Sequence, residues 1–297
     1  MISRLALART DFARTALSAA IQKNWIPRAL GSMMLRPGTE YLGSTKDNNQ
    51  SISIPFVYAI DDTAQIEITN TVMRVLVDDE LVTRPAVTTA VTNGTFNTDV
   101  SGWTDADEGS AASTWAAGGY LQLVGTGSGA ARRRQQVTTV ETGIVHSLDV
   151  VVERGPVLIR VGSSSGADDY VTETTLYTGS HSLAFTPSGD FWIEIFSYTE
   201  YITLVSSITV NAGGTLELTA PWLTADLSKI RWDQSGDVVF VACEGYQQRR
   251  IERRANNSWS VVLYQSDNGP FRPDNTGPIT LTPAATSGDT TLTASAP

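Results

Sequence analysis

The sequence is poor in the residues that build catalytic and metal centres. It has a single cysteine, Cys243, and two histidines, His146 and His181, in 297 residues. One cysteine excludes an intramolecular disulfide framework, and its apolar neighbours favour a buried, unreactive thiol. Zinc sites need clustered cysteine and histidine ligands, and nucleophilic sites need a base beside the nucleophile. We therefore predict a protein that is not an enzyme and has no cofactor.

Long apolar runs and long runs of one charge are also missing. No segment reaches about 18 apolar residues, which argues against a conventional membrane-spanning helix, and the first residues lack the sustained apolar core of a signal peptide. The 31 acidic residues outnumber the 21 basic ones, for a net charge of -10. An acidic surface repels phosphate, so general nucleic-acid binding is not expected. Residues 1–60 differ, because basic residues prevail there.

The residues that are abundant favour an all-β fold. Threonine, valine and glycine recur throughout, whereas lysine- and leucine-rich helical stretches are scarce. Alternating polar and apolar residues predict strands over 51–58, 65–69 and 73–77 in a meander. One short helix is predicted over 11–25, because apolar residues recur there at helical spacing until Pro27.

A change of amino-acid composition near residue 91 predicts an insertion. A Gly/Ser/Thr-rich region lasts until about residue 212. Strand patterns like those before residue 91 then resume at 215–218 and 230–241, and the parts of the chain on either side of the insertion are called the host segments. Strands are predicted over 120–124, 145–151, 157–161, 182–185 and 191–195, as in a β-sandwich. About 120 residues suffice for an independent core. We therefore predict host segments at 1–90 and 213–297, the latter truncated or continuing, around an inserted domain at 91–212.

Several motifs on both sides of the insertion resemble the nozzle or tail-tube proteins of short-tailed bacteriophages. They are collinear with that family. The motifs are Arg9-Thr10-Asp11-Phe12-Ala13-Arg14, Leu35-Arg36-Pro37-Gly38-Thr39, Ile54-Pro55-Phe56-Val57-Tyr58, Thr219-Ala220-Pro221-Trp222, the segment from Ile230 to Phe240, the segment from Arg249 to Arg254, Trp259, and Gly269-Pro270-Phe271.

The resemblance implies a structural subunit in the phage tail, assembled in the cytoplasm of the bacterial host cell. Such a subunit would form a ring, expected to be a hexamer, that contacts the portal or tail adaptor and the tail fibres while phage DNA passes through it. The polar turn Gln234-Ser235-Gly236-Asp237 before an apolar strand is typical of a hairpin in a barrel or propeller blade. We therefore expect a discontinuous, barrel- or propeller-like host domain.

The insertion resembles the jelly-roll folds of carbohydrate-binding modules, through Asn93-Gly94-Thr95-Phe96, Ser101-Gly102-Trp103-Thr104 and residues 204–210. This resemblance implies an alternative function, a carbohydrate-binding adhesin or virion decoration for which host glycan is the partner. Trp115, Tyr170 and Tyr177 are the candidate sugar-stacking residues, although a sandwich core would use the same residue types. A glycan depolymerase is a third and less favoured class. It would need two carboxylates about 5–9.5 Å apart, and the sequence does not give such a separation in space.

The remaining candidates are an interface and a calcium loop. Aromatic and arginine side chains anchor interfaces, so the N-terminal residues and a second arginine cluster are predicted to meet neighbouring subunits, unless the predicted helix packs only on its own host core. Asp168 and Asp169 follow a flexible Ser/Gly loop and are candidate calcium ligands, with an exposed acidic turn as the alternative. The predicted interface residues are Arg9, Phe12, Arg14, Trp25, Arg28, Arg249, Arg250, Arg253 and Arg254.

Overall fold

The computed structural model describes residues 23–28, 32–265, 281–285 and 291–295. Strands dominate this part of the chain, which confirms the all-β prediction. Its helical elements are the 3-10 turns η2 (Lys46–Asn48) and η3 (Thr224–Lys229). Most of the predicted N-terminal helix lies outside the described residues, but its last residue, Trp25, belongs to strand β1 (Trp25–Pro27) and not to a helix.

The host segments form two facing sheets. The first sheet has the order β19-β5-β4-β3, with β6 beside β5, and the second contributes β20-β21-β22-β23. The first contains β3 (Ile52–Ala59), β4 (Asp62–Ile68), β5 (Val72–Val77), β6 (Glu80–Leu81) and β19 (Glu217–Thr219). The second contains β20 (Arg231–Ser235), β21 (Val238–Cys243), β22 (Tyr246–Ala255) and β23 (Ser258–Leu263). A short pair, β7 (Thr83–Arg84) with β18 (Gly214–Thr215), flanks the insertion.

One buried core fills the space between these two sheets and joins residues from both host segments. Phe56 of β3 meets Trp259 of β23 edge to face, with ring centroids 5.1 Å apart. Trp222, from the turn before η3, is buried in the same cluster. Residues of the collinear motifs on either side of the insertion therefore pack together.

The host is a sandwich, and no barrel closes among the described strands, so the barrel- or propeller-like expectation is corrected. The edges of β3 and β20 approach each other without forming a ladder. The Val57 N–H donates to Gln234 Oε1 at 3.1 Å, and Gln234 Nε2 donates to the Val57 carbonyl at 2.7 Å. One glutamine side chain occupies the place where a strand ladder would have closed a barrel.

The inserted segment is a jelly roll. Its strands are β8 (Thr104–Asp105), β9 (Ala112–Ala116), β10 (Tyr120–Val124), β11 (Ala131–Val137), β12 (His146–Arg154), β13 (Val157–Gly162), β14 (Val171–Leu176), β15 (Gly179–Phe185), β16 (Phe191–Ser197) and β17 (Thr203–Val210). They lie in the orders β15-β12-β17-β10-β9 and β14-β13-β16-β11-β8. Except for the hairpin β13–β14, consecutive strands from β10 to β17 alternate between the sheets, as the two Greek keys of a jelly roll require.

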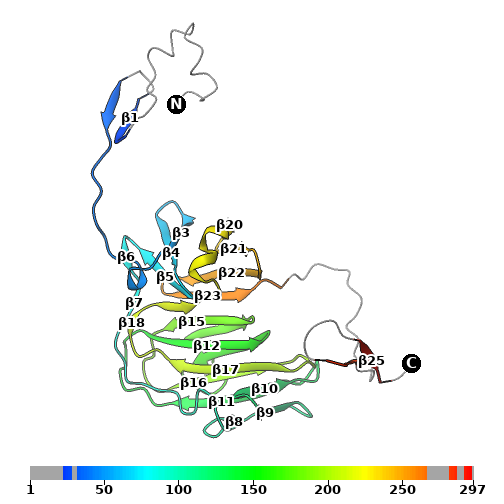
Figure 1. Ribbon diagram of the computed structural model, residues 1–297. Helices are drawn as coiled ribbons and strands as arrows, with labels where there is room; N and C mark the ends of the chain where they lie inside the picture. Colours follow the sequence, from blue (N-terminus) through cyan, green and yellow to red (C-terminus); the bar gives the residue numbers. More distant parts are fainter. Residues whose placement is uncertain (1–22, 29–31, 266–280, 286–290, 296–297) are drawn as a thin grey trace.

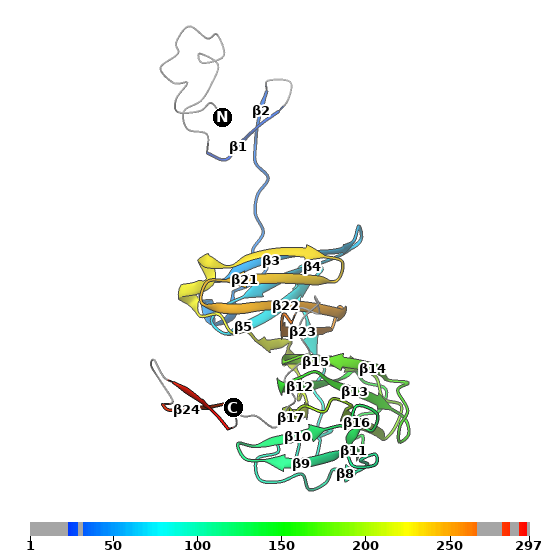
Figure 2. The same ribbon diagram turned by 90° about the vertical axis from the view of Figure 1, so that its right-hand side faces the viewer.

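The jelly roll and the host share one continuous sheet, because β15 pairs antiparallel with β23. Leu183 faces the jelly-roll core, whereas Trp259, which is paired with Ser182, faces the host core. Since neighbouring residues of a strand point to opposite faces, the two cores lie on opposite faces of this sheet. Figures 1 and 2 show the host sandwich stacked on the jelly roll around this joint. The predicted boundaries at residues 91 and 212 stay a prediction.

Two hairpins lie outside these cores. β1 and β2 (Met33–Leu35) pair at the end of an extended segment that leads away from the body (Figure 1). β24 (Leu281–Pro283) and β25 (Leu292–Ala294) pair near the C-terminus.

Candidate functional site

The N-terminal arm, defined here as residues 23–28 and 32–44, exposes apolar side chains. The hairpin register places Trp25 opposite Leu35 and Ile26 opposite Met34. Trp25, Ile26 and Leu35 are 47%, 43% and 62% exposed, respectively. A two-stranded hairpin with three-residue strands is marginally stable by itself in water. Contiguous exposed apolar side chains are typical of surfaces that bind another protein.

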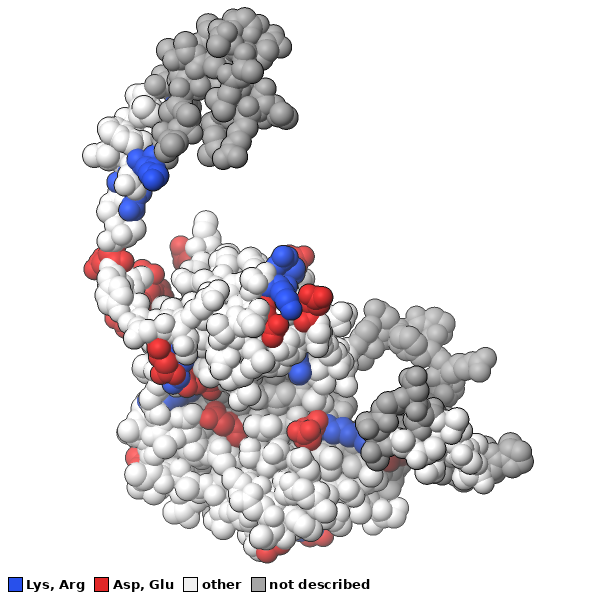
Figure 3. All heavy atoms as spheres, in the orientation of Figure 1, with Lys and Arg blue, Asp and Glu red and all other residues white. Residues whose placement is uncertain are grey.

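The arm is also basic near its hairpin. Arg28 and Arg36 flank the two strands, and the Arg36 Nε–H donates to Asn24 Oδ1 at 2.9 Å. Figure 3 shows basic side chains on the arm, apart from the body. The predicted interface residues Trp25 and Arg28 are therefore both exposed on the arm. Arg9, Phe12 and Arg14 lie outside the described residues.

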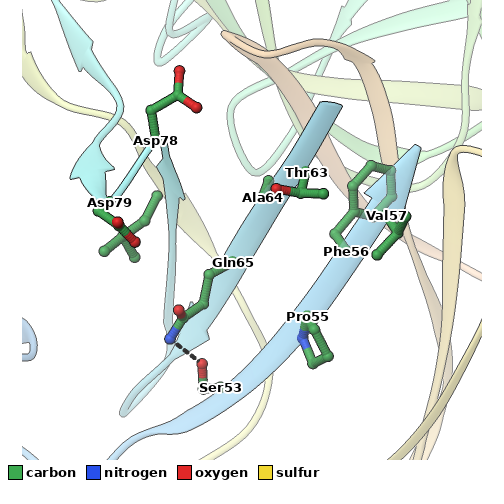
Figure 4. A pocket seen from close by; sticks show the side chains of 10 residues that line it. Ser53, Pro55, Phe56, Val57, Thr63, Ala64, Gln65, Asp78 and Asp79 are labelled. Carbon is green, nitrogen blue, oxygen red and sulfur yellow. Dashed lines mark hydrogen bonds between the residues drawn. The ribbon is translucent and has the colours of Figure 1, made fainter. Parts of the chain in front are cut away.

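A groove of about 450 Å³ crosses the outer face of the β3–β4–β5 sheet. Figure 4 shows Asp78 and Asp79 on one side of the groove and Pro55 and Val57 on the other. The two aspartates form the turn after β5, where both have positive φ, 52° and 65°. Short polar residues tolerate this left-handed conformation better than most others. The groove lining contains two carboxylates and no basic side chain.

A second hollow of about 390 Å³ continues this face towards the arm. Residues Leu42 to Thr45, at the root of the arm, line it together with Glu80. Arg74 also lines it, but its guanidinium donates to the Glu67 carboxylate at 3.0 and 3.1 Å. None of these acidic residues is among the candidate site residues predicted from the sequence. The signal available in the sequence was the acidic run Asp78-Asp79-Glu80 directly after the strand predicted over 73–77.

The predicted arginine cluster lies on β22, where three of its four members have partners in the same chain. Arg253 Nη2 lies 2.6 Å from Asp62 Oδ2 of the facing sheet. Arg250 and Arg254 both contact Glu252, at 3.0 and 3.2 Å. Arg249 lies in a hollow of about 390 Å³ with Trp232, Phe240 and Tyr264. Contact of this arginine cluster with a neighbouring subunit stays a prediction. Arg250, Arg253 and Arg254 already pair within the chain, which weakens the prediction for these three residues.

The run Arg132-Arg133-Arg134 also pairs within the chain. It forms part of β11, on the outer sheet of the jelly roll. Arg132 and Arg160 both donate to the buried Glu194 carboxylate, and both guanidiniums lie over the Phe196 ring, at 4.4 and 5.4 Å from its centroid. Burial alone would raise the pKa of Glu194, but the two arginines outweigh it and hold this pKa below its usual value. This cluster stabilises the jelly roll.

Buried polar groups gather where the two units share their sheet. Arg84 Nη2 donates to Ser182 Oγ at 2.9 Å, and Ser182 Oγ donates to Asp149 Oδ1 at 2.8 Å. Burial lowers the pKa of Arg84 to about 10, against the opposing effect of the Asp149 charge. On the other face of the sheet, His181 Nε2 donates to the Tyr177 carbonyl at 2.8 Å, and Nδ1 lies 2.9 Å from Ser260 Oγ.

His181 is expected to make the protein sensitive to acid. Burial lowers its pKa from 6.5 to about 3; a hydrogen bond to Tyr177 opposes this shift and the Arg254 charge adds to it. Below pH 6.5 the unfolded chain therefore binds a proton at this histidine that the folded chain does not bind. The contribution of His181 to the free energy of unfolding is complete above pH 6.5 and falls as the pH falls. Between pH 6.5 and 4.5 the wild type should lose about 2 kcal/mol more than His181→Gln.

Urea unfolding of both proteins at several pH values measures this difference. The variant keeps an amide that can hydrogen-bond at the same place but does not titrate. Parallel pH dependences of the two proteins would contradict a neutral, buried His181.

The three candidate sugar-stacking residues do not share a surface. Trp115 lies on β9, and Tyr177 comes just before β15, at the opposite end of the same five jelly-roll strands. Four strand spacings separate these edges by about 19 Å. Tyr170 stacks on Phe185 beside the jelly-roll core, and the Arg250 guanidinium lies 4.5 Å from the Tyr177 ring centroid. Each side chain has a separate structural contact.

The calcium candidates Asp168 and Asp169 hold their own loop. Asp169 Oδ1 accepts the Ser163 N–H at 2.8 Å, which lowers the pKa of Asp169, and Asp168 Oδ2 accepts the Glu173 N–H at 3.3 Å. No group of three or more potential metal ligands occurs in the described part of the chain. Calcium binding at this loop stays a prediction, and the carboxylates of Asp168 and Asp169 are its two candidate ligands.

No helix among residues 23–28, 32–265, 281–285 and 291–295 is long and apolar enough to cross a membrane. The comparisons with protein families and with curated proteins found no match.

Proposed function

We propose that this chain is a structural, non-catalytic subunit of a bacteriophage tail. It would form the nozzle or tail-tube ring below the portal and adaptor, enclose part of the path by which DNA leaves the particle, and offer a docking site for tail fibres. The observation that carries the proposal is the N-terminal arm. It holds an apolar, basic hairpin away from both cores. Such an exposed hairpin is typical of a segment that packs against a neighbouring subunit.

The collinear motifs support the same proposal from within the body. Their residues come from both sides of the insertion and meet in one host core through Phe56, Trp222 and Trp259. The jelly roll is then a decoration attached to the ring subunit through the shared sheet. Glycan binding receives no comparable support, because Trp115, Tyr170 and Tyr177 lie apart. We therefore do not propose the adhesin as the main function.

Polar substitution of the arm tests the proposal. The double variant Trp25→Ser/Leu35→Ser should fold normally, since both side chains are exposed and contribute little to either core. It should be incorporated into phage particles at least about tenfold less than wild type, because interface aromatics carry much of the binding energy. Quantitative mass spectrometry of purified particles measures incorporation.

The matched control is Val140→Ser/Ile202→Ser, which replaces two exposed apolar residues of the jelly roll, 65% and 42% exposed. This control should be incorporated like the wild type. Normal incorporation of the arm variant would contradict the proposal, and so would absence of the wild-type chain from particles.

A further inference from the structure

We propose that the β1–β2 hairpin of one copy docks into the groove on the outer face of the β3–β4–β5 sheet of a second copy. This inference rests on the proposed ring function and specifies the contact that builds the ring. It pairs the exposed apolar arm with the hollow on the host body that carries carboxylates and no basic residue.

Charge and polarity match between the two surfaces. The groove offers apolar surface from Pro55, Val57 and Leu76 beside the carboxylates of Asp78 and Asp79. The hairpin offers exposed apolar side chains between two arginines at its opposite ends. Arginine pairs well with carboxylates, and each guanidinium has five N–H donors. Among the described residues, Arg28 donates one hydrogen bond inside the arm, to Met34 Sδ. Arg36 donates two, to Asn24 Oδ1 and to the Pro37 carbonyl, so both arginines keep donors for the groove carboxylates.

The face of the sheet is available for docking, whereas the edge strand β3 is protected. Val57 has both of its outward backbone groups bonded to the Gln234 side chain. Pro55, two residues earlier and with the same outward direction, has no N–H to donate. An incoming strand therefore cannot extend the sheet at β3. The Val57 side chain is 57% exposed and belongs to the groove on the outer face.

The arrangement favours a second copy over the same chain. Residues 36–41 are extended and exposed and carry the hairpin away from the body (Figure 1). Each copy thus presents a donor hairpin and, separately, an acceptor groove. A contact between two different surfaces of identical subunits is heterologous, and such contacts produce a ring when the rotation closes. One type of contact then suffices to join every subunit to the next.

Cross-linking between singly substituted full-length chains tests the docking. Leu35→Cys places a thiol on the hairpin, and Val57→Cys places one in the groove, while the native Cys243 is buried. A bismaleimide should link the two variants into a covalent dimer when they are mixed. Neither variant alone should give this product. Leu35→Cys mixed with Ile202→Cys, exposed on the jelly roll, should give none.

The outcomes separate this inference from the proposed function. Rings without the mixed cross-link would overturn the docking and leave the proposed function standing. A cross-link formed only within a chain that carries both substitutions would show that the arm covers its own groove, which also overturns the docking. A protein that stays monomeric and is absent from tails would overturn both proposals.

Charge reversal gives an independent readout. Asp78→Arg/Asp79→Arg should weaken self-association at least about tenfold in sedimentation, and Arg28→Asp/Arg36→Asp should do the same. Mixing the two variants should restore association, because the reversed groove then meets the reversed arm. The control Glu153→Arg/Glu200→Arg, on exposed jelly-roll positions, should associate like the wild type. Equal association of the groove variant and this control would overturn the proposal.

Discussion

Replacing Glu194 by alanine is expected to lower the free energy of unfolding by about 3 to 5 kcal/mol. The Glu194 side chain is 2% exposed and accepts hydrogen bonds from both Arg132 and Arg160. Its removal leaves two guanidiniums over the Phe196 ring without their shared counter-charge. Breaking a buried ion pair by removing one partner costs far more than breaking an exposed pair, since the remaining charge stays desolvated. Urea unfolding measures the loss.

Glu173→Ala is the matched control. Glu173 also lies beside Arg160, but at 3.9 Å and with a side chain that is 46% exposed. Exposed pairs contribute about 0 to 1 kcal/mol, so this variant should unfold nearly like the wild type. Equal losses for Glu173→Ala and Glu194→Ala would contradict the central place of Glu194 in the cluster.

Gly179→Ala is expected to weaken the joint between the jelly roll and the host by about 3 kcal/mol or more. Gly179 has a φ of 143°, a conformation that L side chains rarely adopt, and it pairs with Val262 of β23. An added Cβ would lie 2.2 Å from the Val261 carbonyl oxygen. Backbone must move to relieve this contact, so the β15–β23 ladder should open while the jelly-roll core survives.

Amide hydrogen exchange localises the effect. Protection should fall along β23 and at the paired residues of β15, whereas β10 and β17 should keep theirs. Gly189→Ala is the control, because a Cβ at Gly189 meets nothing within 4 Å. Unchanged protection of β23 in Gly179→Ala would show that the shared sheet is not held by this pairing.

Local alternation predicted many strands with accurate bounds. Residues 120–124 were predicted to be a strand and form β10, and the strand predicted over 157–161 forms β13 with one further residue. The meander prediction for residues 65–69 and 73–77 is confirmed by the antiparallel pair β4–β5. These strands place apolar side chains on one face and polar ones on the other, and that period of two is legible without tertiary information.

The two arginine-rich strands were missed for a physical reason. β11 and β22 are not among the predicted strands, because their arginines interrupt the alternation of polar and apolar residues. In the fold, Arg132 is 6% exposed beneath neighbouring side chains, and Arg253 crosses the host core to reach Asp62. Long arginine side chains can be buried when a carboxylate from a distant strand pairs with them. That carboxylate is not identifiable from the local sequence.

The sequence predicted only one of the two surfaces of the proposed subunit interface. The basic, aromatic character of residues 1–60 indicated an assembly segment, and Trp25 and Arg28 lie exposed on the arm. The groove could not be predicted, since it depends on the register that places Val57 opposite Thr63 and on the turn at Asp78 and Asp79. The β15–β23 pairing was equally hidden, because it joins strands 79 residues apart at His181 and Ser260.

Electron microscopy of purified particles tests the central claim most directly. The proposal predicts density for this chain as a closed ring on the tail axis below the portal and adaptor, with each host sandwich contacting the next and each jelly roll attached through its shared sheet. Density for the chain only on the capsid surface or on separate fibres, with none around the tail axis, would contradict it.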